Sequence, residues 1–238
     1  MKGVRAYEVS SRLISIDGPD GTGKSTLSAL LTTRLQVVFE PVRVMLVKPT
    51  YFGISPRASQ IGKDFSRIAG HLAPDSQEHN SFFLAAFRAN FEDVVMPALA
   101  EGQIVVLDSS ELRALAFVMA RCCPEAISIT KQEIVIQKLT GGILPRTRVT
   151  LLGEPKEIWK NLCTKQVLDK GDPRDLSEVE LRIKAYREAM LFLREHYSGE
   201  GLDWVNVNIC HSQSNLLVYL AKIIETEIWQ KLVTNLSG

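Results

Sequence analysis

The sequence predicts an α/β protein in which a five-stranded parallel sheet is covered by helices on both faces. Five short apolar segments have the length of buried strands, and segments with helical spacing of apolar residues separate them. Strands that alternate with helical crossovers favour a parallel sheet between two helical layers. The chain has 238 residues, of which 45% are hydrophobic, and it shows no linker or repeat. We therefore expect a single domain over residues 1–238.

The predicted strands share an apolar run that ends near a glycine, a proline or a polar residue. The second run is β-branched and lies between Pro41 and Pro49, and the last run alternates as a strand does. The predicted ranges are 13–17 (LISID), 42–47 (VRVMLV), 103–108 (QIVVLD), 148–153 (RVTLLG) and 203–209 (DWVNVNI).

The predicted helices fill the segments between these strands and follow the last one. Pro97 is expected to kink the second helix near its end, and Pro155 suits a first helical turn. Ser177 with Glu180 predicts a capping box. The segment 130–139 also suits a strand, because it contains an Ile-Val-Ile run. The predicted helical ranges are 24–35, 75–102, 111–122, 130–139, 154–168, 177–197 and 212–235.

Charge and cysteine content exclude several functional classes. The formal net charge is +1, so the whole chain gives no electrostatic attraction toward nucleic acid or an anionic membrane. The four cysteines show no metal or disulfide spacing, which favours reduced thiols. The N-terminal residues lack the apolar core of a signal peptide, and no apolar run approaches the roughly 20 residues of a membrane span. We therefore expect a cytoplasmic protein without a nucleic-acid or membrane partner.

The segment GPDGTGKST, residues 18–26, matches G-x-x-x-x-G-K-[ST] between a predicted strand and a predicted helix. Its glycines allow successive N–H groups to point inward as an anion-binding nest, and the helix N-terminus adds partial positive charge. Lys24 is expected to reach the β- and γ-phosphates, and the Ser25 hydroxyl to ligate Mg²⁺. The motif predicts that this phosphate loop holds a nucleoside triphosphate; a plain glycine-rich turn is the alternative.

Asp108 ends an apolar strand and brings a carboxylate to the carboxyl end of the predicted sheet, where ligands of open α/β sheets bind. Such an acid can hold a metal ion or its waters. An N-cap for the following helix is an alternative role for the same residue. No second carboxylate follows directly and no guanine-reading [NT]-K-x-D motif is present, which argues against water-activating ATPases and against GTPases.

With these motifs the chain resembles the thymidylate kinase family, within the nucleoside monophosphate kinases, over about residues 12–225. The resemblance implies a P-loop NTPase three-layer sandwich with a helical lid at about residues 165–178. It implies transfer of the ATP γ-phosphoryl group, with Mg²⁺, to a small nucleotide, with dTMP converted to dTDP, and it allows a homodimer. It rests on SIDGPDGTGKSTLSALLTTRL, SFFLAAFRANFEDVVMPALAEGQIVVLD, RVTLLGEPKEIWKNL and RIKAYREAMLFL.

The resemblance also implies roles for individual residues. Asp20 falls where the family has an acid that reaches the acceptor's sugar, and Arg88 falls on the arginine that meets the acceptor's base. Tyr186 is a candidate for the acceptor pocket, with helix packing as the alternative. Ser25 and Asp108 are the expected Mg²⁺ ligands. The donor phosphates are expected at Gly18, Asp20, Gly21, Thr22, Gly23, Lys24, Ser25 and Thr26.

The catalytic arginine of this family comes either from the phosphate loop or from the lid. This loop has Gly21 and Thr22 at the corresponding place, so we expect the cation to come from the lid. Arg174 in GDPRD is the candidate, with Lys170 and Lys165 as helpers. A solvated basic surface is the alternative interpretation of these lid residues.

Departures from the family pattern leave the acceptor open. The Asp-Arg-Tyr triplet is Asp108-Ser109-Ser110 here, so an arginine expected near the transferring phosphates is absent. Lys48 stands where the family has another arginine, and it keeps the charge but not the bidentate fork. Arg57 is a candidate for the missing phosphate contact, with a surface arginine as the alternative.

Leu84 aligns with the phenylalanine expected to stack on thymine, and a leucine lacks the aromatic stacking interaction. Two alternatives to a dTMP kinase therefore stay open. One is a kinase of another nucleotide or deoxynucleoside, and the other is a nucleotide-binding protein without transferase activity.

Overall fold

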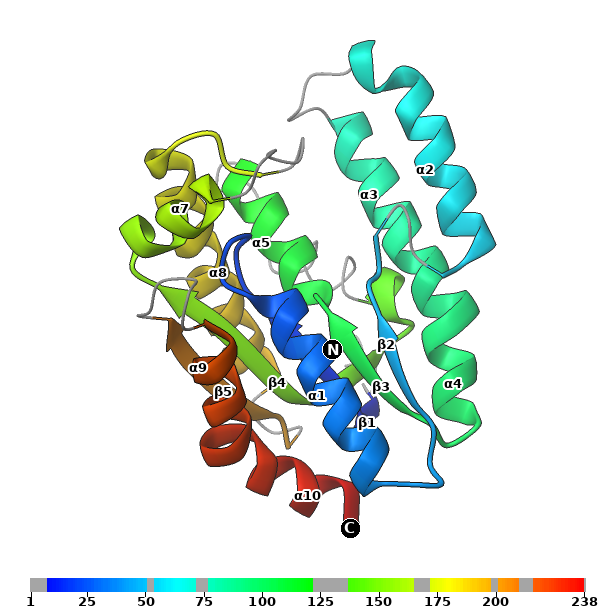
Figure 1. The fold of residues 1–238 in the computed structure, drawn as a ribbon. Coiled ribbons are helices and arrows are strands. Elements are labelled where there is room, and N and C mark those ends of the chain that lie inside the picture. The colour runs from blue at the N-terminus through cyan, green and yellow to red at the C-terminus, as the bar shows by residue number, and fades with distance from the viewer. Residues whose placement is uncertain are drawn as a thin grey trace.

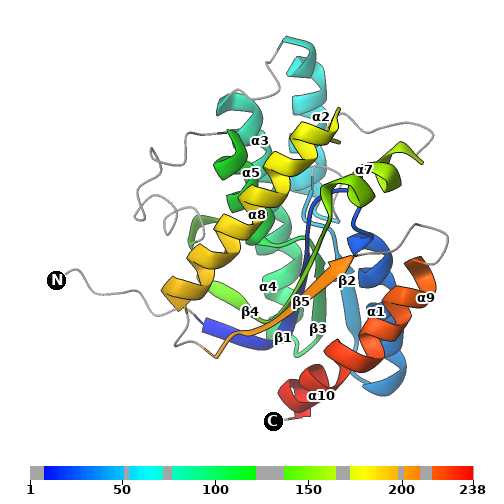
Figure 2. The same cartoon turned by 90° about the vertical axis from the view of Figure 1, so that its left-hand side faces the viewer.

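In a computed structural model the chain folds into three layers, with a parallel sheet between two layers of helices (Figures 1 and 2). The structure describes residues 8–50, 54–71, 77–121, 137–164, 172–197, 201–209 and 216–237. The strands pair in the order β2-β3-β1-β4-β5, and every pair is parallel. This confirms the predicted five-stranded parallel sheet. The strands are β1 (Glu8–Asp17), β2 (Val44–Val47), β3 (Ile104–Asp108), β4 (Ile143–Gly153) and β5 (Asp203–Ile209).

Helices α1, α9 and α10 cover one face of the sheet, whereas α3, α4, α5 and α8 cover the other (Figures 1 and 2). No described helix combines the length and the apolar character that spanning a bilayer would need. The helix bounds are α1 (Lys24–Val38), α2 (Pro56–Ile68), α3 (Gln77–Asn90), α4 (Met96–Ala100), α5 (Glu111–Arg121), α7 (Pro155–Cys163), α8 (Leu176–Tyr197), α9 (Leu216–Ile223) and α10 (Trp229–Ser237).

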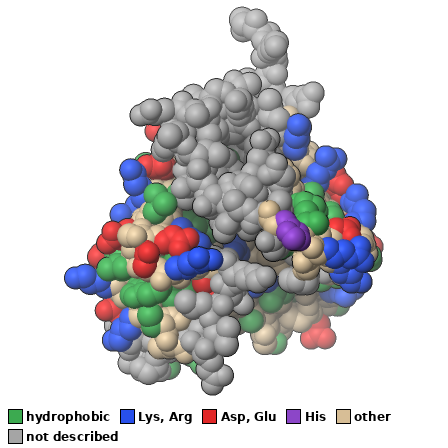
Figure 3. Space-filling model, turned by 90° about the horizontal axis from the view of Figure 1, so that it is seen from above, with side chains coloured by type: hydrophobic (Ala, Val, Ile, Leu, Met, Phe, Trp, Pro, Cys, Tyr) green, Lys and Arg blue, Asp and Glu red, His purple; other side chains and the backbone are tan. Residues whose placement is uncertain are grey.

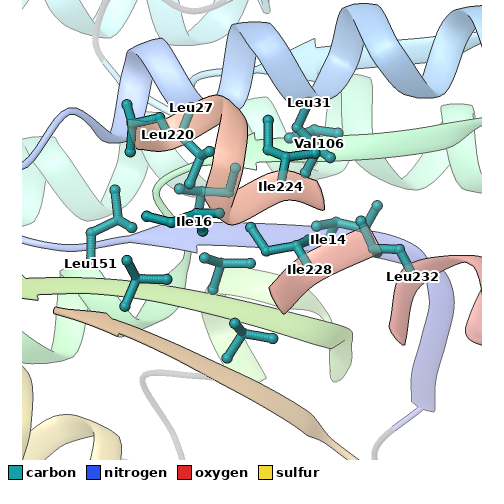
Figure 4. Packing of buried hydrophobic residues seen from close by; sticks show 14 of the residues in the cluster. Ile14, Ile16, Leu27, Leu31, Val106, Leu151, Leu220, Ile224, Ile228 and Leu232 are labelled. Atoms are coloured by element: carbon teal, nitrogen blue, oxygen red, sulfur yellow. The ribbon is translucent and has the colours of Figure 1, made fainter. Parts of the chain in front are cut away.

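The side chains of β1 alternate between two cores. Ile14 and Ile16 point toward α1, α9 and α10, where Leu27 and Leu31 of α1 belong to the same cluster (Figure 4). Leu13 belongs to the cluster on the opposite face. Burying each such aliphatic side chain stabilises the fold by roughly 1.5–3 kcal/mol, so both helical layers are held to the central strand mainly by apolar contact.

Strands β1 and β4 begin earlier than their apolar runs predict, at Glu8 and Ile143. Their first residues pair with each other, Glu8 opposite Ile143 and Ser10 opposite Pro145, before the register shifts between Ser10 and Ile14. Polar residues and a proline occupy these extensions. In β1 the apolar run therefore marks only the buried part of the strand, whereas in β4 a proline and polar residues interrupt a segment that is itself largely buried.

Helix α2 is absent from the sequence-based prediction. It begins after Ser55, whose hydroxyl accepts a hydrogen bond from the Ala58 amide at 3.2 Å, and Pro56 occupies its first turn. Its buried residues are Ala58 and Gly62. Ala58, Ile61, Phe65 and Ile68 nevertheless have helical spacing, so the sequence carries a pattern that the prediction overlooked.

The long helix predicted over 75–102 consists of α3, a π-helical segment (Phe91–Val95) and α4. Pro97 lies just beyond the π segment. Proline has no N–H to donate and its ring crowds the carbonyl four residues earlier, so widening of the helix before Pro97 is the expected response. The terminal helix is likewise divided, by a π segment at Ile224–Ile228.

Asp175, rather than Ser177, caps α8, so the predicted capping box is wrong. The Asp175 carboxylate accepts hydrogen bonds from the Ser177 hydroxyl at 2.6 Å and from the Glu178 amide at 2.9 Å. These bonds hold the pKa of Asp175 below its usual value. Asp and Ser are similarly good N-caps, and here the earlier residue has the geometry to reach the first-turn amide.

Several predicted segments lie partly outside the described residues. They are residues 75–76, 122, 130–136, 165–168 and 212–215 of the predicted helices. Residues 165–171 of the predicted lid, with Lys165 and Lys170, also lie outside them. Residues 137–140 are helical.

Two buried carboxylates anchor the start of α5 to the sheet. Asp17, at the end of β1, accepts hydrogen bonds from the Ser110 amide and the Ser110 hydroxyl, both at 2.7 Å. Glu111 pairs with Arg148 of β4, and the Arg148 guanidinium lies 5.4 Å from the centre of the Trp204 ring. Both side chains of the Glu111–Arg148 pair are almost fully buried. These contacts fix the first turn of α5 relative to β1 and β4.

The Asp17 carboxyl makes folding pH-dependent. Burial raises its pKa to about 6, although the hydrogen bonds from Ser110 oppose this shift. The folded state therefore binds the proton more tightly than the unfolded chain, whose reference value is 3.8, so the stabilisation is complete below that value and is lost as pH rises through 6. The difference is about 3 kcal/mol of unfolding free energy.

For Asp17→Asn we expect this fall in unfolding free energy between about pH 4 and pH 7 to disappear, because asparagine carries no titrating proton. Urea unfolding at a series of pH values measures it. Asp64→Asn, on the exposed side of α2, is the matched control and should keep the wild-type slope. Equal slopes for Asp17→Asn and wild type would contradict the assignment.

Removing one partner of the Glu111–Arg148 pair should lower the free energy of unfolding strongly, whereas replacing both partners by apolar residues should lower it little. Glu111→Gln leaves the buried guanidinium without its counter-ion, so we expect a loss of about 3–5 kcal/mol of unfolding free energy. The double change Glu111→Leu with Arg148→Met should recover most of this loss, since Arg148 Nε and Nη1 already lack hydrogen-bond partners among the described residues. Denaturant unfolding compares the variants, and a double variant less stable than the single one would refute this account.

Candidate functional site

The phosphate loop joins the carboxyl end of β1, the central strand, to α1 (Figure 1). Gly21 and Gly23 have φ angles of 90° and 85°, a region that favours glycine. A Cβ atom on Gly18 would collide with the backbone oxygen of Leu151, and one on Gly21 would lie 2.9 Å from the backbone oxygen of Ile158. The loop therefore needs glycine both to turn and to approach β4 and α7 closely.

The first turn of α1 presents backbone amides that no side chain caps. Gly23 is the N-cap residue, and the first turn contains no acidic residue. The first four N–H groups of an α-helix lack intrahelical partners, and the N-terminus carries partial positive charge. The geometry at this end of α1 suits a phosphate group. Ser25 is exposed and Thr26 half-buried in the same turn.

Lys24 lies inside the loop. Its Nζ is 2.6 Å from Asp20 Oδ1 and 3.5 Å from the Pro19 carbonyl oxygen, and the residue is only 6% exposed. Burial lowers the pKa of Lys24, and the Asp20 carboxylate opposes this shift. The buried Thr22 hydroxyl donates to the same Pro19 oxygen at 2.8 Å. The loop thus holds the ammonium group beside the helix amides.

Asp20 is the meeting point of three cations. Besides Lys24, Arg113 Nη2 of α5 lies 3.6 Å from Asp20 Oδ2, and Arg182 Nη1 of α8 lies 3.3 Å from it. Burial alone would raise the pKa of Asp20, but the cations outweigh it and hold the pKa well below its usual range. We call Asp20, Lys24, Arg113 and Arg182 the Asp20 cluster.

The sequence-based prediction missed two members of this cluster, Arg113 and Arg182. The available signals were their positions: Arg113 lies one turn into the helix after Asp108, and Arg182 lies one turn before Tyr186. Each faces the carboxyl edge of the sheet only because α5 and α8 pack against each other there.

Asp108 lies beside the phosphate loop, because Ile16 of β1 pairs with it across the sheet. It is 3% exposed, and its Oδ1 atom has no hydrogen-bond partner among the described residues. Lys48 Nζ lies 3.9 Å from Oδ2. The alternative role of Asp108 as an N-cap is wrong, because the Ser110 hydroxyl accepts the hydrogen bond from the Leu112 amide at 3.1 Å.

The candidate acceptor residues on α3 and α2 lie at two different places. Leu84 packs at the edge of the core beneath β3. The half-exposed Arg88 donates to Glu92, and Arg57 donates to Glu92 at 2.9 Å and to Asp93 at 2.8 Å. The hydrogen bonds from Arg88 and Arg57 hold the pKa of Glu92 below its usual value. The charge of Arg57 is therefore satisfied by carboxylates that tie α2 to the π segment.

Tyr186 is buried in the core between α5 and α8. Burial raises the pKa of its hydroxyl, and the charges of Arg113, Asp17 and Asp20 also act on it. Tyr186 therefore lies near the Asp20 cluster and stays protonated at neutral pH. Both interpretations of this residue, pocket lining and helix packing, are compatible with that position.

Arg174 is exposed just before α8, and its backbone amide donates to the Glu178 carboxylate at 2.8 Å. Within the described ranges, the α8 cation that contacts the phosphate loop is Arg182. The role of Arg174 as the lid cation stays a prediction. Seen from this end of the molecule, basic and acidic side chains are interspersed on the described surface (Figure 3).

Comparison with known proteins gives relatives over nearly the whole chain. The thymidylate kinase family model matches residues 16–125. The thymidylate kinase of Helicobacter pylori is 26% identical over 215 residues, which are 89% of this chain and 97% of that protein. The thymidylate kinase of Brachyspira hyodysenteriae is 28% identical over 116 residues, 46% of this chain and half of that protein.

A solved structure shares the fold. The thymidylate kinase of Ehrlichia chaffeensis superposes with a TM-score of 0.59 at 14% identity, covering 91% of this chain and 99% of that one. It supports the three-layer architecture with a phosphate loop at the end of the central strand. The chain is therefore similar to thymidylate kinases in sequence along most of its length, and it shares their fold.

Proposed function

We propose that the chain transfers the γ-phosphoryl group of ATP to a nucleoside monophosphate, with dTMP as acceptor and dTDP as product. The observation that carries this proposal is the glycine-built phosphate loop, which opens onto the uncapped N-terminus of α1 and holds the Lys24 ammonium beside it. Sequence similarity supports the reaction, since both relatives described above are thymidylate kinases.

Mg²⁺ fits the residues at the end of β3. Asp108 Oδ1 is buried without a hydrogen-bond partner among the described residues, and the Ser25 hydroxyl lies in the first turn of α1. Mg²⁺ prefers oxygen ligands and typically takes one or two from the protein, with water and phosphate oxygens completing its coordination. When bound, the ion neutralises charge on the phosphates.

The chain's own residues align the two substrates and compensate their charge. The acceptor phosphate is already a nucleophile, so positioning and electrostatic stabilisation dominate such a reaction. We propose Lys24, Lys48 and Arg174 as catalytic cations, with closure of the lid excluding water. The proposed acceptor contacts are Asp20, Leu84, Arg88, Arg57 and Tyr186.

We place the reaction in the cytoplasm. Cys163 is a free, exposed cysteine, in keeping with a reducing compartment. The homodimer that the resemblance allows stays a prediction.

Lys24→Ala tests the phosphate loop. Loss of the ammonium should lower kcat by about 10²- to 10³-fold and weaken ATP binding, because this group faces the charge of the donor phosphates. The measurement is a coupled assay with ATP, Mg²⁺ and a panel of nucleoside monophosphates and nucleosides. Lys184→Ala, on the exposed side of α8, should keep wild-type activity.

The same panel separates the alternatives. Turnover of dTMP at ordinary kinase rates supports the proposal. Exclusive use of another acceptor would show that the protein is a kinase of that acceptor and not of dTMP. ATP binding with no product from any acceptor would select the non-catalytic alternative. Full activity of Lys24→Ala would remove the loop from the mechanism.

Leu84→Phe tests the acceptor base. An aromatic ring at this position adds a stacking contact of about 0.5–1.5 kcal/mol, so KM for dTMP should fall roughly 2- to 10-fold while KM for ATP is unchanged. Leu84→Met keeps the volume without the ring and should retain the wild-type KM. Steady-state kinetics, with each substrate varied in turn, measures both KM values. Equal KM values for dTMP in the two variants would show that the acceptor base does not contact residue 84.

A further inference from the structure

We propose that Arg113 binds the phosphate group of the acceptor nucleotide, at the place where the family has an arginine after the strand-end aspartate and this chain has Ser109. The inference rests on the proposed function and names the residue that makes the site selective for a phosphorylated acceptor.

The Arg113 side chain reaches back to Ser109, which precedes α5 and has a φ of 85°. Arg113 lies in the first turn of α5, and its Nη1 atom donates to Ser109 Oγ at 3.4 Å. Ser109 itself is held at the junction of β1 and β3, because its amide donates to the Ile16 carbonyl oxygen at 2.9 Å. The guanidinium thus occupies space that an arginine at 109 would reach.

Arg113 also lies between the two halves of the site. On one side its Nη2 atom is 3.6 Å from Asp20 Oδ2 in the phosphate loop. On the other its guanidinium carbon lies 6.0 Å from the centre of the Phe83 ring, next to Leu84 on α3. An acceptor whose base contacts α3 must place its phosphate between α3 and the loop to reach the donor, and Arg113 lies on that line.

The charge balance favours an anion beside Arg113. Asp20 is shared among three cations. Arg182 also pairs with Glu178 at 2.8 Å, whereas Lys24 and Arg113 have only the Asp20 carboxylate as an ion-pair partner among the described residues. Burial lowers the pKa of Arg113, but Asp20 and other acidic groups outweigh this and raise the pKa, so the residue stays charged. Its side chain is 22% exposed, which leaves it partly desolvated and still accessible. A phosphate is bound more strongly by such a group than by a fully solvated one.

The helix that carries Arg113 is fixed before any ligand arrives. Ser110 is bound by the Asp17 carboxylate, and Glu111 by Arg148, in the same turn. Little conformational freedom of the backbone is therefore lost when the guanidinium contacts a phosphate.

A purely structural role predicts different kinetics. If Arg113 served only to position Asp20, its loss would act through Lys24 on ATP and through Asp20 on the acceptor's sugar. The KM for ATP would then change, and the affinity for thymidine would fall together with that for dTMP. A direct contact with the acceptor phosphate changes the KM for the monophosphate and leaves the KM for ATP within about twofold.

The first experiment uses Arg113→Ala and Arg113→Lys in the full chain. We expect the KM for the monophosphate to rise about 10- to 100-fold in Arg113→Ala, with a smaller rise in Arg113→Lys, which keeps the charge and loses the fork. Arg67→Ala, an exposed arginine of α2, is the matched control and should behave as wild type. Arg113→Lys keeps the test decisive if the alanine variant does not fold. An equal rise in the KM for ATP would overturn the inference.

The second experiment isolates the phosphate by calorimetry without ATP. The affinity for dTMP should fall in Arg113→Ala, whereas the affinity for thymidine should be unchanged. The double variant Ser109→Arg with Arg113→Ala should regain part of the lost dTMP affinity. A matching loss of thymidine affinity, or no recovery in the double variant, would overturn the inference.

These outcomes are distinct from those that test the proposed function. If wild-type protein phosphorylates a monophosphate and Arg113→Ala keeps its KM, the inference fails and the proposed function stands. If wild-type protein neither binds nor phosphorylates any monophosphate, the proposed function fails and the inference fails with it.

Discussion

The close packing of the phosphate loop against β4 and α7 is the constraint on which the rest of the site depends. Gly18 lies against the Leu151 backbone and Gly21 against Ile158, with no room for a side chain at either position. Asn161 of α7 also donates to the Gly21 carbonyl oxygen at 3.2 Å. Because the loop is held on both sides, the N-terminus of α1 and the Lys24 ammonium have a fixed position at the carboxyl edge of the sheet. The other charged groups of the site can act on a bound phosphate only where they face this fixed position of the α1 N-terminus and Lys24.

Three aspartates meet at this edge, and their surroundings give them different properties. Asp17 is buried against Ser110 with a pKa raised to about 6, so it serves the turn into α5. Asp20 is surrounded by cations and stays ionised. Asp108 alone has a buried oxygen without a hydrogen-bond partner among the described residues, which suits a metal ligand. The pKa values of Asp17 and Asp20 differ because desolvation dominates at Asp17 and neighbouring positive charge dominates at Asp20.

How much of this could be predicted depends on how far apart in the sequence the contacting residues lie. A strand buried on both faces, such as β3, is a continuous apolar run, and the phosphate loop is contiguous, so both follow from local sequence. The early part of β1, with its polar residues, gives no such pattern, whereas α2 has Ile61, Phe65 and Ile68 at helical spacing that the prediction overlooked. The partners of Asp20 come from three helices, and Arg182 lies 162 residues away along the chain. Only the packing of α5 against α8 brings them together.

A sequence motif specifies which residue stands at a given position of the chain. A bound phosphate instead interacts with whichever charged groups lie near it in the folded structure. By sequence position, the site lacks an arginine because Ser109 stands in its place, and Arg57 is the candidate that the motif comparison offers instead. Judged by contact, the charge of Arg57 is satisfied by Asp93 and Glu92, while Arg113 lies against Ser109 and Asp20. On the proposed role of Arg113, the positive charge is present where the acceptor phosphate needs it. The serine after Asp108 then no longer favours a protein that binds nucleotides without transferring phosphate.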